Sequence, residues 1–218
     1  MAARGQWWLV GVVAGCASAE PAPAFFAGLD ARVILSDAAT PGEAAVRDAA
    51  GMDAAAEPGR LDGFLAAHNG ARARLDLPPL AWSSEVALVA QAYADQLAAG
   101  CLDSLVHSDR SARNGWGENL ASYGTTGLGP NGSAEGTVEL WESELGCYSY
   151  GPFESGTNAT CSAACERYGG CGHYTQLVWR STQRVGCGVA DCREGAWRKS
   201  YWVCNYDPAG NVRGQLPY

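Results

Sequence analysis

Residues 199–211 read KSYWVCNYDPAGN, and this stretch decides the fold of the C-terminal third of the chain. Tyr, Trp and Val are frequent in it as far as residue 206, and these residue types favour β-strands. Residues 184–190 have a similar composition, and each of the two segments contains a cysteine. A turn signal around residues 193–195 separates them, so we predict two antiparallel strands.

Helical patterns dominate the residues that precede these strands. We expect one helix over residues 61–75, stopped by Pro78-Pro79, and a second from Ser83 or Ser84 to Gly100. A third helix begins near Ser133. Helices that come mostly before the strands predict an α+β domain, in which helices cover a sheet.

Composition and the N-terminus indicate a secreted protein. The 218 residues carry a net charge of −8 with no basic patch, which argues against nucleic acid as a partner. No apolar run reaches the ~20 residues of a transmembrane helix. Residues 1–19 resemble a signal peptide that ends in Ala17-Ser18-Ala19. Residues 20–60, rich in Ala and Pro, predict a disordered linker or pro-segment, and the folded domain should span 61–218.

The nine cysteines lie on both sides of the predicted signal-peptide cleavage site. Cys16 lies inside the predicted signal peptide, although the sequence VAGC at 13–16 also resembles a lipobox that would make Cys16 a lipid anchor. The eight that remain are an even number, which predicts disulfides formed in an oxidising compartment. Sequons at Asn131 and Asn158 predict glycosylation of a secreted surface.

The candidate chemistry rests on the few histidines and on two acids. His68 lies on the apolar face of the first helix, which is typical of a structural histidine. His107 and His173 each follow a cysteine closely, and Glu118 and Glu144 are the acids that we expect near them. These four residues suit either a hydrogen-bonded polar cluster or a divalent metal site. Motifs of serine hydrolases and zinc proteases are absent from the sequence.

Several motifs resemble those of the CAP superfamily, which comprises cysteine-rich secretory proteins, antigen 5 and the pathogenesis-related proteins of class one. The two long signatures are GHYTQLVW at 172–179 and YWVCNYDPAGN at 201–211. Short matches occur in the same order at 67–69, 105–108, 117–120 and 141–144. The resemblance covers residues 61–218 and is strongest to the plant pathogenesis-related branch. It implies a three-layer α-β-α sandwich with a central antiparallel sheet.

The resemblance also implies specific site residues and disulfides. The cleft tetrad of the family falls on His107, Glu118, Glu144 and His173, and in some members the histidines bind Zn²⁺ or another divalent ion. The plant branch implies the disulfides Cys101–Cys192, Cys165–Cys171 and Cys187–Cys204. The additional cysteines Cys147 and Cys161 would then pair with each other.

The function that the resemblance implies is binding rather than catalysis. We expect a secreted, monomeric, non-enzymatic CAP protein with a defence-type role that binds a sterol or another lipid. Tyr148, Tyr150 and Phe153 form an aromatic loop of the kind found in sterol-binding members, although Ser155 and Gly156 stand where further aromatics are needed. Two alternatives remain: a metal-dependent hydrolase that uses the tetrad, and a precursor whose C-terminal residues 208–218 are released as a signalling peptide.

Overall fold

The computed structural model describes residues 57, 59–127, 131–154 and 170–218, so the predicted signal peptide and nearly all of residues 20–60 lie outside the described residues. The strands are β1 (Ala81–Trp82), β2 (Gly117–Thr125), β3 (Arg184–Glu194) and β4 (Trp197–Asp207). The α-helices are α1 (Phe64–Ala73), α2 (Ser84–Gly100), α3 (Ala134–Glu142) and α4 (Gly172–Leu177). Two short 3₁₀ helices, η1 (Gly59–Leu61) and η2 (Ser143–Cys147), complete the described elements.

The sheet is built around the predicted pair of strands. β3 and β4 are antiparallel from Arg184 opposite Asp207 to Glu194 opposite Trp197, and Gly195 turns the chain with a φ of 60°. β2 adds to β4 in an antiparallel sense, and the strand order is β1-β3-β4-β2. β1 pairs with β3 in a parallel sense, so this short edge strand departs from the antiparallel pattern of the other three.

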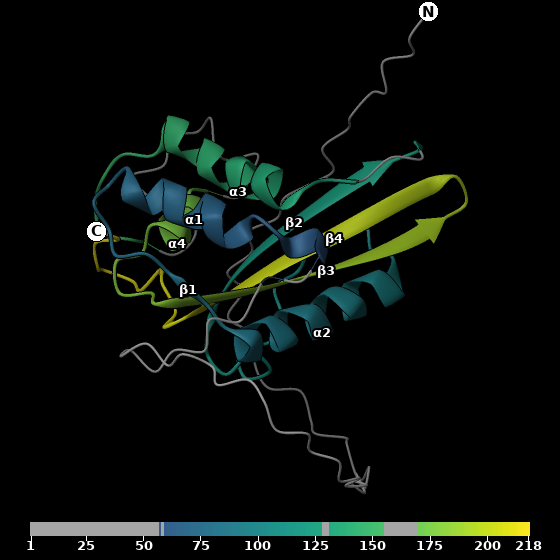
Figure 1. Cartoon of the computed structure of the whole chain (residues 1–218), viewed down its shortest axis with the longest axis horizontal. Coiled ribbons are helices and arrows are strands. Elements are labelled where there is room, and N and C mark those ends of the chain that lie inside the picture. Colours follow the sequence, from purple (N-terminus) through teal and green to yellow (C-terminus); the bar gives the residue numbers. More distant parts are fainter. Residues whose placement is uncertain (1–56, 58, 128–130, 155–169) are drawn as a thin grey trace, which may run out of the picture. The chain divides into compact units, whose positions relative to one another are not determined.

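Helices cover both faces of the sheet, which confirms the predicted three-layer α+β fold (Figure 1). α2 lies on one face, whereas α1, α3 and α4 lie on the other. Two glycines of β3 allow the backbone of α2 to approach closely: a Cβ atom at Gly186 would lie 2.2 Å from Ala87 N, and one at Gly188 would lie 2.3 Å from Gln91 Cα. Among the described helices, none is long and apolar enough to cross a membrane.

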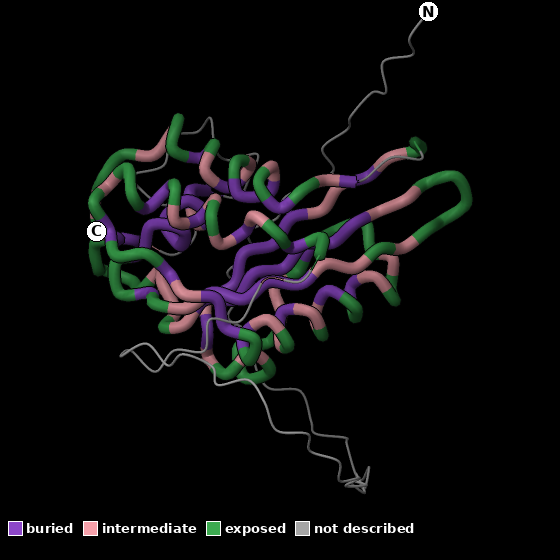
Figure 2. The backbone as a smooth tube through the Cα atoms, in the orientation of Figure 1, coloured by how far each residue is buried: buried purple, intermediate pink, exposed green. Residues whose placement is uncertain are grey.

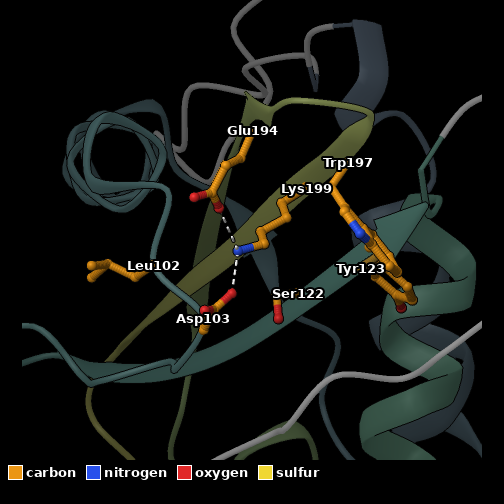
Figure 3. Close-up of a pocket in the computed structure, with 8 residues that line it drawn as sticks. Leu102, Asp103, Ser122, Tyr123, Glu194, Trp197 and Lys199 are labelled. Atoms are coloured by element: carbon orange, nitrogen blue, oxygen red, sulfur yellow. Dashed lines mark hydrogen bonds and ion pairs between the residues drawn. The ribbon is translucent and has the colours of Figure 1, made fainter. Parts of the chain in front are cut away.

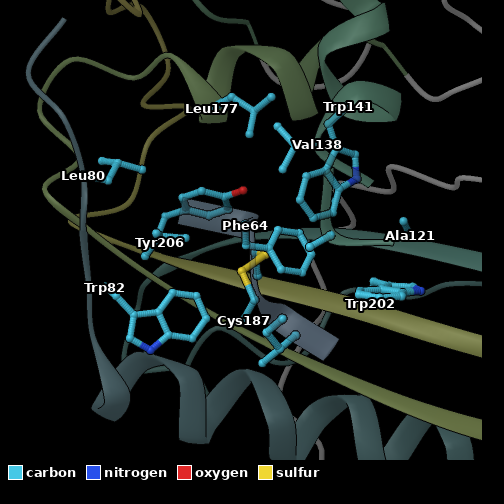
Figure 4. Close-up of a cluster of buried hydrophobic side chains, with 14 of the residues drawn as sticks. Phe64, Leu80, Trp82, Ala121, Val138, Trp141, Leu177, Cys187, Trp202 and Tyr206 are labelled. Atoms are coloured by element: carbon cyan, nitrogen blue, oxygen red, sulfur yellow. A yellow bond between two sulfur atoms is a disulfide. The ribbon is translucent and has the colours of Figure 1, made fainter. Parts of the chain in front are cut away.

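The main core lies between the sheet and the layer that contains α1 and α3 (Figure 4). Phe64 of α1 is fully buried, with its ring 6.2 Å from that of Trp141 and 5.8 Å from that of Trp202. The disulfide between Cys187 and Cys204 joins β3 to β4 in the same core. Figure 2 shows that buried residues follow the central strands and the inward faces of the helices.

Side chains at the helix ends explain where the helices begin. Ser83 Oγ accepts a hydrogen bond from Val86 N at 3.3 Å, and Ser133 Oγ accepts one from Gly136 N at 3.0 Å. α2 extends to Gly100, and the next residue, Cys101, adopts the left-handed conformation, with a φ of 46°. Cys101 is bonded to Cys192 of β3, so the residue that ends the helix also fixes it to the sheet.

The disulfides of the described residues agree with the pairing that the resemblance implies. Cys101–Cys192 ties the end of α2 to β3, and Cys187–Cys204 ties β3 to β4. Cys147 and Cys171 are also disulfide-bonded. The pairs predicted for them, Cys147–Cys161 and Cys165–Cys171, each include a cysteine that lies outside the described residues.

Arg72 is a fully buried guanidinium on α1 that binds backbone carbonyls. Its Nε donates to Pro78 O at 2.8 Å, and its Nη1 donates to Leu177 O at 3.0 Å and to Trp179 O at 2.9 Å. Burial lowers the pKa of Arg72 to about 10, so the group keeps its proton at neutral pH. Arg72 therefore holds α1 against the segment that follows α4.

The fold includes contacts from residues before the predicted start at Leu61. Glu57 accepts hydrogen bonds from the backbone N–H groups of Gly63, at 2.8 Å, and of Leu65 at the start of α1. Arg60 forms an ion pair with Asp191 at 2.8 Å, and its guanidinium lies 5.2 Å from the ring centroid of Trp202. These residues cap α1 and cover one edge of the core.

Candidate functional site

His107 and Glu118 form the first of two histidine–glutamate pairs. His107 lies in the loop between α2 and β2, and Glu118 is the second residue of β2. The Nδ1–H of His107 donates to Glu118 Oε1 at 2.8 Å. The Glu118 side chain is inaccessible to solvent, whereas that of His107 is 24 % exposed. The carboxylate therefore fixes the orientation of a ring that remains partly open to solvent.

Glu118 receives three further hydrogen bonds. Ser108 donates its backbone N–H to Oε1 at 2.9 Å and its hydroxyl to Oε2 at 2.6 Å, and Asn205 donates to Oε2 at 3.5 Å. Burial raises the pKa of Glu118, but the bonds from His107 and Ser108 and the charge of Arg113 outweigh that effect and hold it below its usual value. Glu118 is therefore a carboxylate whose two oxygens are both engaged.

His173 and Glu144 form the second pair, which is more deeply buried. His173 is the second residue of α4, and Glu144 lies in η2, because α3 ends at Glu142. The Nδ1–H of His173 donates to Glu144 Oε1 at 2.6 Å, and Tyr174 N donates to Glu144 Oε2 at 2.9 Å. The His173 ring is stacked on that of Trp141 at 6.3 Å. Both pairs thus use Nδ1 to bind a carboxylate.

The two pairs meet at β2, an edge strand of the sheet. Glu118 and its neighbour Asn119 point to opposite faces, because side chains alternate along a strand. Glu118 binds His107, and Asn119 Nδ2 donates to His173 O at 3.1 Å. The four predicted residues therefore form two pairs that are connected through two consecutive residues of β2.

His68 belongs to a buried hydrogen-bond chain that leads to the same strand. Its Nδ1–H donates to Phe64 O at 2.7 Å, so its Nε2 accepts from the Tyr206 hydroxyl at 2.9 Å. Tyr206 in turn accepts from Asn119 Nδ2 at 3.2 Å. Burial lowers the pKa of His68 to about 4. His68 is thus a neutral structural histidine, as its position on the apolar helix face predicted.

The side chains that could ligate a metal ion can be compared with the metal site that the resemblance implies. Among the described residues, no group of three or more His, Cys, Asp or Glu side chains could hold a metal ion. The arrangement of each pair does match a common feature of metal sites, in which a carboxylate fixes the second nitrogen of a ligating histidine. Two imidazole Nε2 atoms are fewer than the protein ligands of a structural zinc site.

The predicted aromatic loop is mostly packed against the protein. Tyr148 packs on Tyr174 with ring centroids 5.2 Å apart, and Phe153 is buried against Trp179. Tyr150 is 53 % exposed. The structure therefore leaves one of the three predicted ligand-binding side chains open to solvent.

The two sequons fall in different parts of the chain. Asn131 is buried, and its Nδ2 donates to Tyr123 O at 2.7 Å and to Arg198 O at 3.1 Å. Its side-chain nitrogen, the atom that a glycan would modify, is thus hydrogen-bonded inside the fold. Asn158 lies outside the described residues.

A family model for the cysteine-rich secretory protein family, CAP, matches residues 65–206. The chain belongs to the CAP family. "Pathogenesis-related protein 1A" of *Nicotiana tabacum* is 43% identical over 155 residues, which cover 71% of this chain and 79% of that protein. "Pathogenesis-related protein 1" of *Arabidopsis thaliana* is 40% identical over 155 residues and covers 71% of this chain and 80% of its own length. Within the family, the chain therefore resembles the plant pathogenesis-related proteins.

Solved CAP structures agree with the fold. The crystal structure of NaASP2 with Zn²⁺ has a TM-score of 0.58 and 29% identity, and the match covers 73% of this chain and 84% of that one. The crystal structure of Na-ASP-1 has a TM-score of 0.56 and 28% identity, over 72% of this chain and 41% of that one.

Two residues that bind Glu118 were not predicted from the sequence. Ser108 is not among the predicted site residues, yet it supplies two of the hydrogen bonds to Glu118. Asn205 lies directly opposite Glu118 in the register of β2 and β4. A strand alignment would have placed Asn205 beside Glu118, but β2 carries a mixed sequence with no clear alternation.

Proposed function

We propose that this CAP protein is secreted and acts in defence as a binding module rather than as an enzyme. The names of its plant relatives, pathogenesis-related proteins, support the defence role. The observation that carries the non-enzymatic assignment is the state of the two carboxylates. A general base needs a carboxylate oxygen that can accept a proton from the substrate. Glu118 and Glu144 instead hold histidine rings and backbone N–H groups with both oxygens.

This assignment is tested by assaying the secreted protein for peptide and ester hydrolysis. We expect no activity above that of the double variant His107→Gln/His173→Gln. Hydrolysis that disappears in a folded double variant would overturn the proposal and favour the metal-dependent hydrolase.

The ligand that we propose is apolar, with a sterol as the leading candidate. Tyr150 and Leu216 support it, because 53 % and 49 % of these residues are exposed. The Tyr150 ring packs on that of Tyr218, two residues beyond Leu216 in the sequence, with centroids 4.9 Å apart. Exposed apolar side chains that gather at one place are typical of a binding surface.

Saturable binding of a radiolabelled sterol tests the ligand. We expect the variant Tyr150→Ala to bind several-fold more weakly than the unmodified protein. Leu88→Ala is the matched control, because Leu88 is 72 % exposed on α2, away from the aromatic loop. Absence of saturable binding, or an equal loss in both variants, would contradict the proposal.

We also propose that His107 and His173 bind a divalent ion through their Nε2 atoms. The Nδ1–H bonds to Glu118 and Glu144 support this, since they fix the tautomer that presents Nε2. A bound ion would link the loop before β2 to α4. Calorimetric titration with Zn²⁺ should show saturable binding at neutral pH that is lost in His173→Gln. Equal affinity in the variant would refute the site.

The peptide-precursor alternative is weakened by the contacts of the C-terminal segment. Gly210 N donates to Gln176 Oε1 at 3.0 Å, and Asn211 Nδ2 donates to Gly172 O at 2.8 Å. Further along, Phe153 N donates to Gln215 O at 2.8 Å. Cleavage after Asp207 should therefore leave residues 208–218 bound to the domain. Gel filtration of the cleaved protein would separate a released peptide from a retained one.

A further inference from the structure

A pocket of about 170 Å³ opens at the end of the sheet that is distant from the histidine–glutamate pairs (Figure 3). It is formed by the loop after α2, the end of β2 and the hairpin of β3 and β4. Tyr123 of its wall lies five residues beyond Glu118 on β2, which is about 17 Å along an extended strand. The pocket is therefore separate from the site already described.

Trp197 and Leu102 supply apolar side chains to the pocket. Trp197 is 42 % exposed, and its ring lies over Gly124, where a Cβ atom would be 3.4 Å from the indole Cζ3. In Figure 3, Trp197 lies on one side of Lys199 and Leu102 lies on the other. Gly124 thus lets the partly exposed indole ring lie against β2.

The polar groups of the pocket carry a net negative charge. Lys199, the single lysine of the sequence, donates to Cys101 O at 3.2 Å and forms ion pairs with Asp103 and, at 3.9 Å, with Glu194. The Lys199 side chain is 13 % exposed, whereas those of Asp103 and Glu194 are 87 % and 73 % exposed. The ammonium is therefore set back beneath two carboxylates that face solvent.

One disulfide places both carboxylates. Asp103 follows Cys101 by two residues, Glu194 follows Cys192 by two, and Cys101 is bonded to Cys192. The rim of the pocket is thereby fixed before any ligand arrives, which reduces the entropy lost on binding.

We propose that this pocket binds a small organic cation: an alkylammonium or alkylguanidinium group on a short apolar stem. The exposed indole suits a cation placed over its face, and the two rim carboxylates supply charge complementarity. Each water molecule takes about 30 Å³ in the liquid, so the volume admits a group of only a few heavy atoms. The pocket is thus too small for a sterol, and its ligand is distinct from the one proposed above.

Titration with n-butylguanidinium and n-butylammonium tests the proposal. Binding should appear by NMR as a shift of the Trp197 indole N–H, and it should weaken with added salt. A short peptide that contains one arginine would show whether the same group binds when it belongs to a polypeptide. The neutral probe n-butanol should bind several-fold more weakly than the two cations. Equal binding of n-butanol would show that the pocket is an apolar cavity without selectivity for cations, and would overturn the proposal.

Matched variants separate the pocket from the overall negative charge of the protein. Asp103→Asn combined with Glu194→Gln should weaken n-butylguanidinium binding about tenfold, as should Trp197→Leu. Glu85→Gln is the control, because Glu85 is an exposed acid at the far end of α2. Undiminished binding in the pocket variants, or an equal loss in the control, would refute the site. Thermal melts check that each variant is folded.

Discussion

Nδ1 of His173 lies 2.6 Å from Oε1 of Glu144, and both residues are buried beside Trp141. The other oxygen of Glu144 accepts the backbone N–H of Tyr174. One carboxylate thus supports both the ring and the backbone at the start of α4. This helix is short, with only six residues, and depends on such contacts for its position.

Replacement of Glu144 by Ala should destabilise the protein by about 3 kcal/mol, because it leaves two buried N–H donors without an acceptor. Urea denaturation of Glu144→Ala measures the loss. Glu139→Ala is the control, since Glu139 is exposed on the neighbouring α3 and should change stability by less than about 0.5 kcal/mol. Equal stability of the two variants would contradict the supporting role of Glu144.

The buried His68 should make the protein less stable in acid. Its pKa is about 4 in the folded state and about 6.5 in the unfolded chain, so between these values the unfolded state binds a proton that the folded state does not. Stability should therefore fall as the pH drops from about 6.5 to about 4, by about 3 kcal/mol, and this contribution should change little below that range. Free energies of unfolding measured at several pH values test the effect.

His68→Gln provides the comparison, because glutamine does not titrate. The difference in unfolding free energy between this variant and the unmodified protein should depend on pH between about 4 and about 6.5. A constant difference across that range would show that His68 titrates normally in the fold.

Arg72 should be one of the most sensitive positions of α1. Arg72→Met removes the guanidinium donors to the carbonyls of Pro78, Leu177 and Trp179, so we expect a loss of about 3–5 kcal/mol. Arg74→Met is the matched control on the same helix: Arg74 is 59 % exposed and pairs with Glu142 at the surface, which contributes less than about 1 kcal/mol. Similar melting temperatures for the two variants would be inconsistent with the buried role.

We expect Asn131 to carry no glycan in the folded protein. Its Nδ2 donates two hydrogen bonds, and its backbone carbonyl oxygen accepts one from Trp202 Nε1 at 3.3 Å. Ser133 of the same sequon caps α3. Peptide mapping after enzymatic removal of N-glycans in ¹⁸O water should find Asn131 unlabelled. Labelling at high occupancy would mean that this part of the fold differs in the secreted protein.

Sequence patterns predicted the elements that carry strong periodicity or clear caps. The β3–β4 hairpin and α2 with its cap Ser83 are confirmed, because strand-forming residues and a serine before an apolar helix face act locally. α4 was not predicted: six residues contain too few turns for a helical period, and Cys171, His173 and Arg72 hold it through contacts distant in sequence. The strand β2 was not predicted, because it has polar residues on both faces at its start.

The candidate site shows the same division. The four residues of the two pairs were predicted from the small number of histidines and from the family motifs, but the connection of the pairs through Glu118 and Asn119 of β2 was not. That arrangement depends on the register between β2 and β4, which places Asn205 opposite Glu118 and Cys204 opposite Asn119. Register is a property of the assembled sheet, and the sequence of one strand alone does not determine it.

The contacts of Glu57 set a limit on trimming of the N-terminal segment. This side chain accepts the N–H groups of Gly63 and Leu65, which otherwise begin α1 without partners. An exopeptidase that removes Glu57 would uncap a helix whose first residue, Phe64, anchors the core. Digestion that passes Glu57 should therefore cost folding free energy.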